Sequence, residues 1–148
     1  MPNGLNKHYI VCEDLFKIYK IADLEVVALR GLDLVLSRCE VASIVGASGI
    51  GKSTLLNILA GFDSPSSGSV VVGDNKLLNM SSKEIEVYRR DEVGFVWQQT
   101  SRNLFPYLTA LENVALPMML TDLSVKERQT RAAELLNIVG LGKRMDHV

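Results

Sequence analysis

The sequence predicts an α/β fold in which an antiparallel β layer precedes a glycine-rich bend and several helices. Residues 9–20 and 26–37 alternate apolar and polar side chains, as half-buried antiparallel strands do. The apolar run at 41–45 then bends into "STLLNILAG", whose apolar residues recur with helical spacing. Strands mixed with helices in this order are typical of α/β proteins.

Composition restricts the function classes. The chain has 148 residues, 47% of them hydrophobic, and a net charge of −1, so it is long enough for a sizeable core and no nucleic-acid partner is expected. No apolar run is long enough to span a membrane, and the first residues do not resemble a secretory signal, so a cytoplasmic location is expected. Cys12 and Cys39 lie in apolar surroundings and are expected to be reduced and buried, with no metal.

The elements after the first two strands follow from local composition. The run "VASIV" (41–45) is rich in β-branched residues, which suits a strand buried on both faces. The helix after it is expected to stop at Gly61. "DSPSSGSV" predicts a turn, "SVVVG" (69–73) a short strand, and "VGFVW" (93–97) a second buried strand.

Three later helices are predicted to begin at a hydroxyl residue that is followed three positions on by glutamate. These pairs are Ser81 and Glu84, Thr109 and Glu112, and Ser124 and Glu127. The last helix is expected from about 125 to 139, ended by Gly140. Its predicted apolar face consists of Ala132, Leu135, Leu136 and Val139.

The bend "GASGIGKST" fits the phosphate-binding P-loop pattern G-x-x-x-x-G-K-[ST], or Walker A. Its glycines let backbone N–H groups approach phosphate oxygens at the start of a helix. Lys52 would reach the β and γ phosphates, Ser53 would ligate Mg²⁺, and Thr54 would contact the α-phosphate side. The alternative is a turn that only joins a strand to a helix. The predicted nucleotide-binding residues here are Gly46, Ala47, Ser48, Gly49, Ile50, Gly51, Lys52, Ser53 and Thr54.

Five stretches together resemble the ATP-binding subunit of ABC transporters. They are "LFKIYK", "ALRGLDLVLS", "GASGIGKSTLLNILAGFDSPSSGSV", "RRDEVGFVWQQ" and "LTALENVALPMML". The likeness covers essentially the whole chain, corresponds to the N-terminal portion of such a subunit, and is strongest to the lipoprotein-releasing and macrolide-export branch. It implies a P-loop NTPase fold, with ATP and Mg²⁺ as cofactors. A P-loop kinase or GTPase would not explain the last of these stretches.

The resemblance assigns roles to two further residues. Tyr19 would stack on the adenine ring, a role that a ring face can fill without base-specific hydrogen bonds; the alternative is a tyrosine that caps a sheet edge. Gln98 would contact Mg²⁺ and the attacking water, and its loop would touch the permease. Gln99 is the alternative to Gln98, and both glutamines could be plain loop residues. Lys52 and Gln98 are thus the predicted catalytic residues, and Ser53 and Gln98 the predicted metal ligands.

The sequence departs from the family pattern at several positions. Cys39 stands where the family has a turn glycine; if that turn needs a positive φ, Cys39 is strained by about 1 kcal/mol. Ile50 replaces a small loop residue, and Trp97 replaces phenylalanine before Gln98. The loop after Gln98 is longer than usual. Apolar groups in 104–120 are expected either to contact a permease helix or to pack inside the domain.

The family's acidic strand end (Walker B), signature motif and switch histidine are not found before Val148. Asp91 and Glu92 precede an expected strand, and His147 is misplaced for the switch. We therefore expect a truncated chain, with a nucleotide-binding core at 1–98 and the start of a helical subdomain at 99–148. The complete protein would be a dimeric ATPase, or one paired with a second ATPase subunit, peripheral on the inner face of the cell membrane and powering a permease. This chain alone would be nearly inactive; alternatively it is a non-catalytic, self-associating module.

Overall fold

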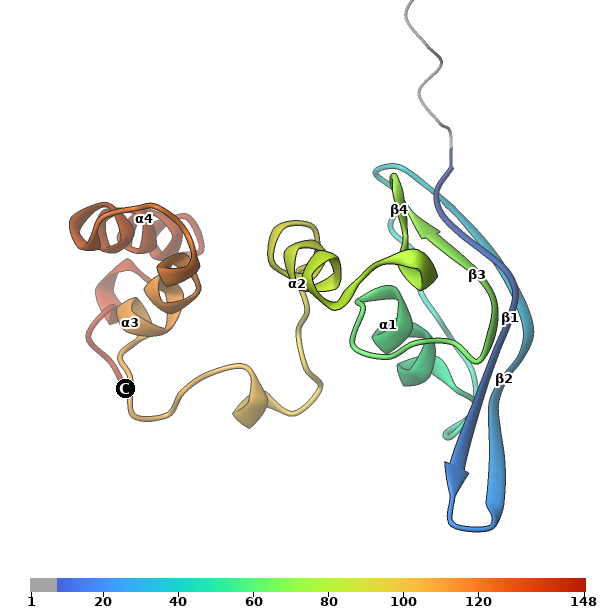
Figure 1. Cartoon of the computed structure of the whole chain (residues 1–148). Helices are drawn as coiled ribbons and strands as arrows, with labels where there is room; N and C mark the ends of the chain where they lie inside the picture. The colour runs from blue at the N-terminus through green and yellow to red at the C-terminus, as the bar shows by residue number, and fades with distance from the viewer. Residues whose placement is uncertain (1–7) are drawn as a thin grey trace, which may run out of the picture. The chain divides into compact units, whose positions relative to one another are not determined.

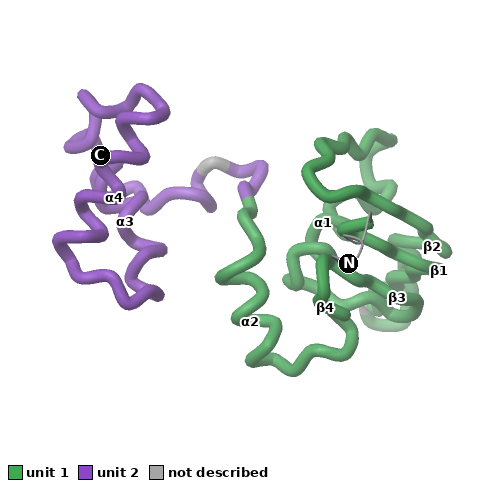
Figure 2. Tube along the Cα trace, turned by 90° about the horizontal axis from the view of Figure 1, so that it is seen from above, with its two compact units in different colours: residues 1–95 green, residues 96–148 purple. Residues whose placement is uncertain are grey.

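A computed structural model of the chain describes residues 8–148, except for the side chains of Ile21 and Thr100. The chain forms two compact units, one that ends at Phe95 and one that comprises 96–148 (Figure 2). Each unit is described by itself below. The assignment of 1–98 and 99–148 to a nucleotide-binding core and a helical subdomain stays a prediction.

Among residues 8–148, the first unit contains four strands and two α-helices, and the second contains two further α-helices (Figure 1). The strands are β1 (His8–Ile21), β2 (Leu24–Ser37), β3 (Ser67–Val72) and β4 (Asn75–Lys76). The helices are α1 (Lys52–Leu59), α2 (Ser82–Asp91), α3 (Ala110–Ala115) and α4 (Val125–Ile138). Short 3₁₀ turns lie at Leu77–Asn79, Thr100–Arg102, Leu116–Leu120 and Gly142–Arg144. Within the described residues, no helix combines the length and apolar character that crossing a bilayer requires.

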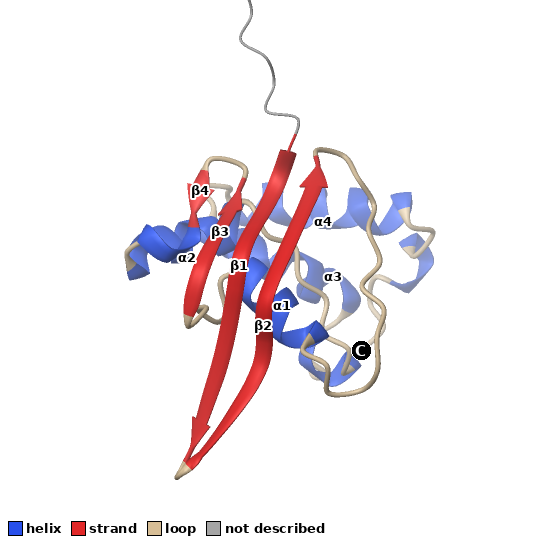
Figure 3. Ribbon diagram, turned by 90° about the vertical axis from the view of Figure 1, so that its right-hand side faces the viewer, coloured by secondary structure: helices blue, strands red, loops and turns tan. Residues whose placement is uncertain are grey.

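The strands form one antiparallel sheet in the order β2-β1-β3-β4. Strand β1 is central, and its Val11 pairs with Val35 of β2 on one side and with Val71 of β3 on the other. Helices α1 and α2 lie on one face of this sheet (Figure 3). The predicted antiparallel layer and the short strand after the "DSPSSG" turn are therefore confirmed.

The core of the first unit lies between the sheet and α1. Leu15 and Cys12 of β1, Val70 of β3 and Ile58 of α1 are each less than 3% exposed. Burial raises the pKa of the Cys12 thiol to about 11, so this cysteine is a buried hydrophobic residue, as predicted. Tyr88 of α2 joins the core, and its hydroxyl donates to the Leu59 carbonyl at 2.6 Å.

The ends of the helices follow local hydrogen bonds. All three predicted capping boxes are present, at Ser81, Thr109 and Ser124, each with reciprocal bonds to the glutamate three residues on. After α1, Gly61 N donates to Ile58 O and Phe62 N to Asn57 O. This is a Schellman motif. The same pair of bonds follows α4, where Gly140 and Leu141 donate to Asn137 and Leu136.

The two predicted buried strands at 41–45 and 93–97 were wrong. Neither segment is a strand, and neither pairs with any strand in the described part of the chain. Val41 and Val45 are 99% and 86% exposed, and Val96 is 85% exposed. Apolar composition favours burial, but a strand also needs a partner for its backbone N–H and C=O groups. Phe95 instead packs edge-on against Phe62, with ring centroids 5.1 Å apart.

Two smaller expectations also failed. Cys39 is exposed rather than buried, because it occupies the turn between β2 and the 41–45 segment. In α4, Ala132 and Leu136 are buried as predicted, but Val139 is 66% exposed. Val139 is the C-cap residue, where the chain has already left the helical path.

Candidate functional site

The predicted phosphate-binding loop connects the 41–45 segment to α1. Gly51, which precedes the first helical residue, has a φ of 98°. A Cβ atom added there would lie 2.3 Å from the carbonyl oxygen of Ala28 in β2. Only glycine fits this position, because the backbone has a positive φ and also packs directly against the strand. The start of α1 is thereby anchored on the sheet.

The first turn of α1 can bind an anion. No side chain caps the helix at Gly51, and the first intrahelical bond into this end is from Leu55 N to Gly51 O at 2.9 Å. The amides of Lys52, Ser53 and Thr54 therefore precede the intrahelical ladder and are available to phosphate oxygens. The helix dipole adds a partial positive charge at the same place.

Lys52 supplies the cation of the loop. Its Nζ donates to the carbonyl oxygens of Gly46, at 3.0 Å, and Ala47, at 2.6 Å. The ammonium group thus lies over the loop that precedes its own helix. Phosphate oxygens can replace these exposed carbonyl oxygens as its acceptors, since the charge-assisted bonds that result are the stronger ones.

A pocket of about 440 Å³ lies between the loop and β2. Gly49 and Ile50 line it from the loop, and residues of β2 around Ala28 line it from the sheet. The Ile50 side chain is 62% exposed, so the replacement of a small residue by isoleucine is accommodated at the surface. The loop residues 46–50 are all exposed, which leaves them accessible to a ligand.

Tyr19 is half-buried on β1 and takes part in a polar cluster. Its hydroxyl donates to Oδ2 of Asp63 at 2.7 Å, while Lys17 Nζ lies 2.5 Å from Oδ1 of the same carboxylate. The Lys17 ammonium also lies 4.8 Å from the centre of the Tyr19 ring. Burial raises the pKa of Asp63, but hydrogen bonds from Lys17 and Tyr19 more than offset this and lower it overall.

Tyr19 is also close to the loop through the β1–β2 hairpin. It pairs with Val26, two positions along β2 from Ala28, the strand residue that the loop contacts. Cross-strand and along-strand spacings place Tyr19 roughly 8 Å from Ala28. Sequence reasoning found Tyr19 but missed Lys17 and Asp63. The alternation of Lys17 and Tyr19 on one strand face was the available signal for Lys17, and nothing local pointed to Asp63.

Gln98 is exposed and belongs to the second unit. The Asn103 side chain bonds to the backbone of the residues on both sides of Gln98. It accepts from Trp97 N at 2.7 Å and donates to Trp97 O at 2.8 Å and to Gln99 O at 3.4 Å. Gln98 and Ser53, the two predicted metal ligands, thus belong to different units. Among the described residues, no group of three or more histidine, cysteine or acidic side chains could hold a metal.

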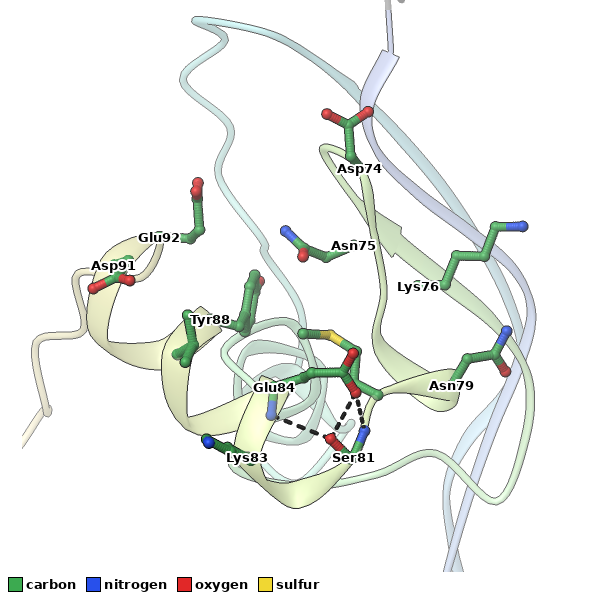
Figure 4. A pocket seen from close by; sticks show the side chains of 12 residues that line it. Asp74, Asn75, Lys76, Asn79, Ser81, Lys83, Glu84, Tyr88, Asp91 and Glu92 are labelled. Atoms are coloured by element: carbon green, nitrogen blue, oxygen red, sulfur yellow. Dashed lines mark hydrogen bonds between the residues drawn. The ribbon is translucent and has the colours of Figure 1, made fainter.

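A second pocket, of about 630 Å³, lies between β4, the Leu77–Asn79 turn and α2 (Figure 4). Its lining carries charges of both signs, including Asp74, Lys83 and Glu84. The Glu84 carboxylate is already bonded to the N–H and hydroxyl of Ser81 in the capping box. None of the predicted site residues lines this pocket.

The sequence profile of the ABC transporter family matches residues 29–148, most of the chain. The chain belongs to the ABC transporter family. Among curated ABC relatives, an uncharacterised ABC transporter ATP-binding protein of Thermotoga maritima is 45% identical over 134 residues, which are 90% of this chain and 56% of that protein. The lipoprotein-releasing system ATP-binding protein LolD of Cytophaga hutchinsonii is 42% identical, over 90% of this chain and 58% of that protein.

Solved ABC structures support the same fold. The dimeric ATP-binding cassette MJ0796, in a post-hydrolysis state bound to ADP and Pi, is 38% identical with a TM-score of 0.81, over 93% of this chain and 60% of that one. CbiO1 of Clostridium perfringens is 27% identical with a TM-score of 0.79, over 96% and 54%. The predicted family and α/β fold class are confirmed. The chain spans between 56% and 58% of the length of the two curated relatives.

Proposed function

We propose that the chain is the ATP-binding part of an ABC transporter ATPase and that residues 46–54 hold the triphosphate of ATP. One observation carries this proposal: an uncapped helix start and the Lys52 ammonium converge on one glycine-rich loop. Both features supply positive charge, and the exposed backbone between them supplies N–H donors. The cassette MJ0796, which was solved with ADP and Pi, has the same fold over this region.

The site residues take the following roles in this proposal. Lys52 binds the β and γ phosphates, and the amides at the start of α1 bind phosphate oxygens. The exposed Ser53 hydroxyl is a suitable Mg²⁺ ligand, as is the Gln98 side-chain oxygen. Bound Mg²⁺ would neutralise phosphate charge. Tyr19 provides the face on which adenine stacks.

The whole protein would use ATP binding and hydrolysis to power a membrane permease. It would contact that permease through the Gln98 loop and the helices of 99–148, and would dimerise or pair with a second ATPase subunit, as a peripheral protein on the cytoplasmic face of the membrane. The signature motif, Walker B acid and switch histidine are not among the 148 residues. We therefore propose that this chain by itself binds ATP weakly and has negligible hydrolytic activity, since no base is placed to activate water.

The test is a calorimetric titration of the chain with ATP and Mg²⁺, compared with the Lys52→Ala variant. Loss of charge-assisted phosphate bonds should weaken binding at least about tenfold. Lys20→Ala is the matched control, because Lys20 is an exposed lysine on β1 whose only described ion pair is with Glu25. Equal binding by wild type and Lys52→Ala, or no binding by either, would refute the nucleotide site and favour a non-catalytic interaction module.

A further inference from the structure

We propose that Asp63 and Lys17 are positioning residues for Tyr19. They hold its ring so that a purine base can stack on only one of the two ring faces. The inference rests on the proposed function, because the base is that of the nucleotide held by the loop. It adds two positioning residues to that function and restricts stacking to one face of the Tyr19 ring.

The three side chains form a closed set of contacts. Asp63 uses both carboxylate oxygens, Oδ2 for the Tyr19 hydroxyl at 2.7 Å and Oδ1 for Lys17 Nζ at 2.5 Å. Lys17 Nζ in turn lies 4.8 Å from the centre of the Tyr19 ring. A tyrosine side chain has two torsions, and fixing its Cα in β1 and its hydroxyl on Asp63 removes most of its freedom.

The cluster is more sheltered than an ordinary surface ion pair. The Lys17 and Asp63 side chains are 13% and 25% exposed, whereas the neighbouring pair Lys20–Glu25 is 77% and 59% exposed. Exposed pairs contribute little to stability, but a partly buried charge must keep its partner. Lys17 also donates to Ser64 O at 2.7 Å, so its ammonium is held in place from two sides.

Asp63 connects this cluster to the helix that carries the loop. Its backbone N–H donates to Asn57 O at 3.2 Å, at the end of α1, and its Oδ1 accepts from Ser64 N at 2.8 Å. Through Asp63, the orientation of Tyr19 is therefore fixed relative to α1, the helix whose first turn would bind the phosphates. This arrangement sets where a base lies relative to its own triphosphate.

The contacts also define what Tyr19 can recognise. One ring face is covered by the Lys17 ammonium, so a base can stack only on the opposite face. The hydroxyl is already bonded to Asp63 and has no free proton for a base edge. The contact that the ring itself offers is stacking, which favours purines over pyrimidines by area and does not separate adenine from guanine.

The experiment compares two ligands of the chain, Mg²⁺-ATP and inorganic tripolyphosphate, which shares the phosphates but has no base. In Asp63→Ala and Lys17→Met, the dissociation constant for ATP should rise about fivefold, the value of a weakened stacking contact. Tyr19→Phe, which loses only the hydroxyl, should raise it about twofold. All three should bind tripolyphosphate as the wild type does, and GTP should compete with ATP equally well in the wild type.

Glu25→Ala is the matched control, since it breaks the adjacent β1–β2 ion pair without touching the cluster, and it should change neither constant. Variants that weaken ATP and tripolyphosphate equally, or Asp63→Ala with unchanged ATP affinity, would overturn the positioning role. If the wild type does not bind tripolyphosphate at all, the proposed phosphate site is wrong, and the inference that rests on it is wrong as well.

The hydrogen bond between the Tyr19 hydroxyl and Asp63 can also be tested without nucleotide, which matters if Asp63→Ala does not fold. With ¹³C at the tyrosine ζ carbon, the Tyr19 resonance should move in Asp63→Asn and stay fixed in Glu25→Ala. A resonance that is the same in wild type and Asp63→Asn would show that the hydroxyl is not held by this carboxylate.

Discussion

Strand β3 and the segment at 41–45 are both short and rich in valine, yet they have opposite environments. In β3, Val70 is 2% exposed and pairs with Cys12 of the central strand. In the segment, Val45 is 86% exposed and pairs with no described strand. The difference is the partner: β3 lies beside β1, whose backbone groups satisfy its own. Apolar side chains are buried only where the backbone is also hydrogen-bonded.

The largest effect expected from this comparison is on matched valine substitutions. Val70→Ala should lower the free energy of unfolding by about 2 kcal/mol, because it removes buried methyl groups and leaves a cavity. Val45→Ala should change it by less than about 0.5 kcal/mol, the usual range for an exposed position. Urea denaturation followed by circular dichroism measures both. If both variants lose a similar amount of unfolding free energy, Val45 is buried in solution, and the difference in environment between β3 and the 41–45 segment does not exist.

A second prediction concerns the capping boxes, which form without any distant partner. Ser124→Ala removes the cap of α4 and should destabilise that helix by about 1 kcal/mol. The measurement is helical ellipticity during thermal unfolding, with Ser101→Ala as a control at a hydroxyl residue outside any cap. An unchanged melting curve for Ser124→Ala would contradict a stabilising role for this box.

The same box should respond to acid. Hydrogen bonds from the Ser124 hydroxyl and backbone N–H hold the pKa of Glu127 below its usual value. A lowered folded-state pKa contributes stability above the unfolded pKa, about 4.3 for glutamate, and that contribution is lost as the pH falls through the folded value. The effect of Ser124→Ala should therefore shrink in strong acid; an effect that grew on acidification would have the wrong sign.

The smallest predicted effect lies in the turn between β2 and the 41–45 segment, where Cys39 has a φ of 62°. The strain anticipated for a non-glycine residue in this turn has its structural basis here. Cys39→Gly should raise the free energy of unfolding by about 0.5 to 1 kcal/mol, after the larger entropy of glycine in the unfolded chain is allowed for. Cys39→Ala retains the Cβ and should gain nothing. Equal stability of all three proteins would show that the turn is unstrained.

Much of the fold was predictable because its determinants are local. A capping box is complete within four residues, so all three helix starts were found at the right serine or threonine. The end of α1 at Gly61 depends on one residue that adopts a positive φ at little cost. The two wrong strand predictions had a non-local cause: 41–45 and 93–97 have strand composition, but composition does not say whether a partner strand is present.

In the candidate site too, contacts that are local in sequence were predictable and distant ones were not. The residues of the loop are contiguous, so motif spacing identified them together. The Tyr19 cluster joins β1 to Asp63, which is 44 residues further along the chain than Tyr19, and no local pattern signals such a contact. Gln98 was assigned from family resemblance alone; the bonds that Asn103 makes on both sides of it were not foreseen.

The contact between Gly51 and Ala28 has a consequence for mutational scanning. The atom of Ala28 that meets Gly51 is its carbonyl oxygen, which every amino acid has. Exchanging the side chain at position 28 leaves that atom in place, whereas any side chain at position 51 collides with it. A substitution survey of the chain would therefore attribute the contact to the loop alone and would not register the strand's share in supporting it.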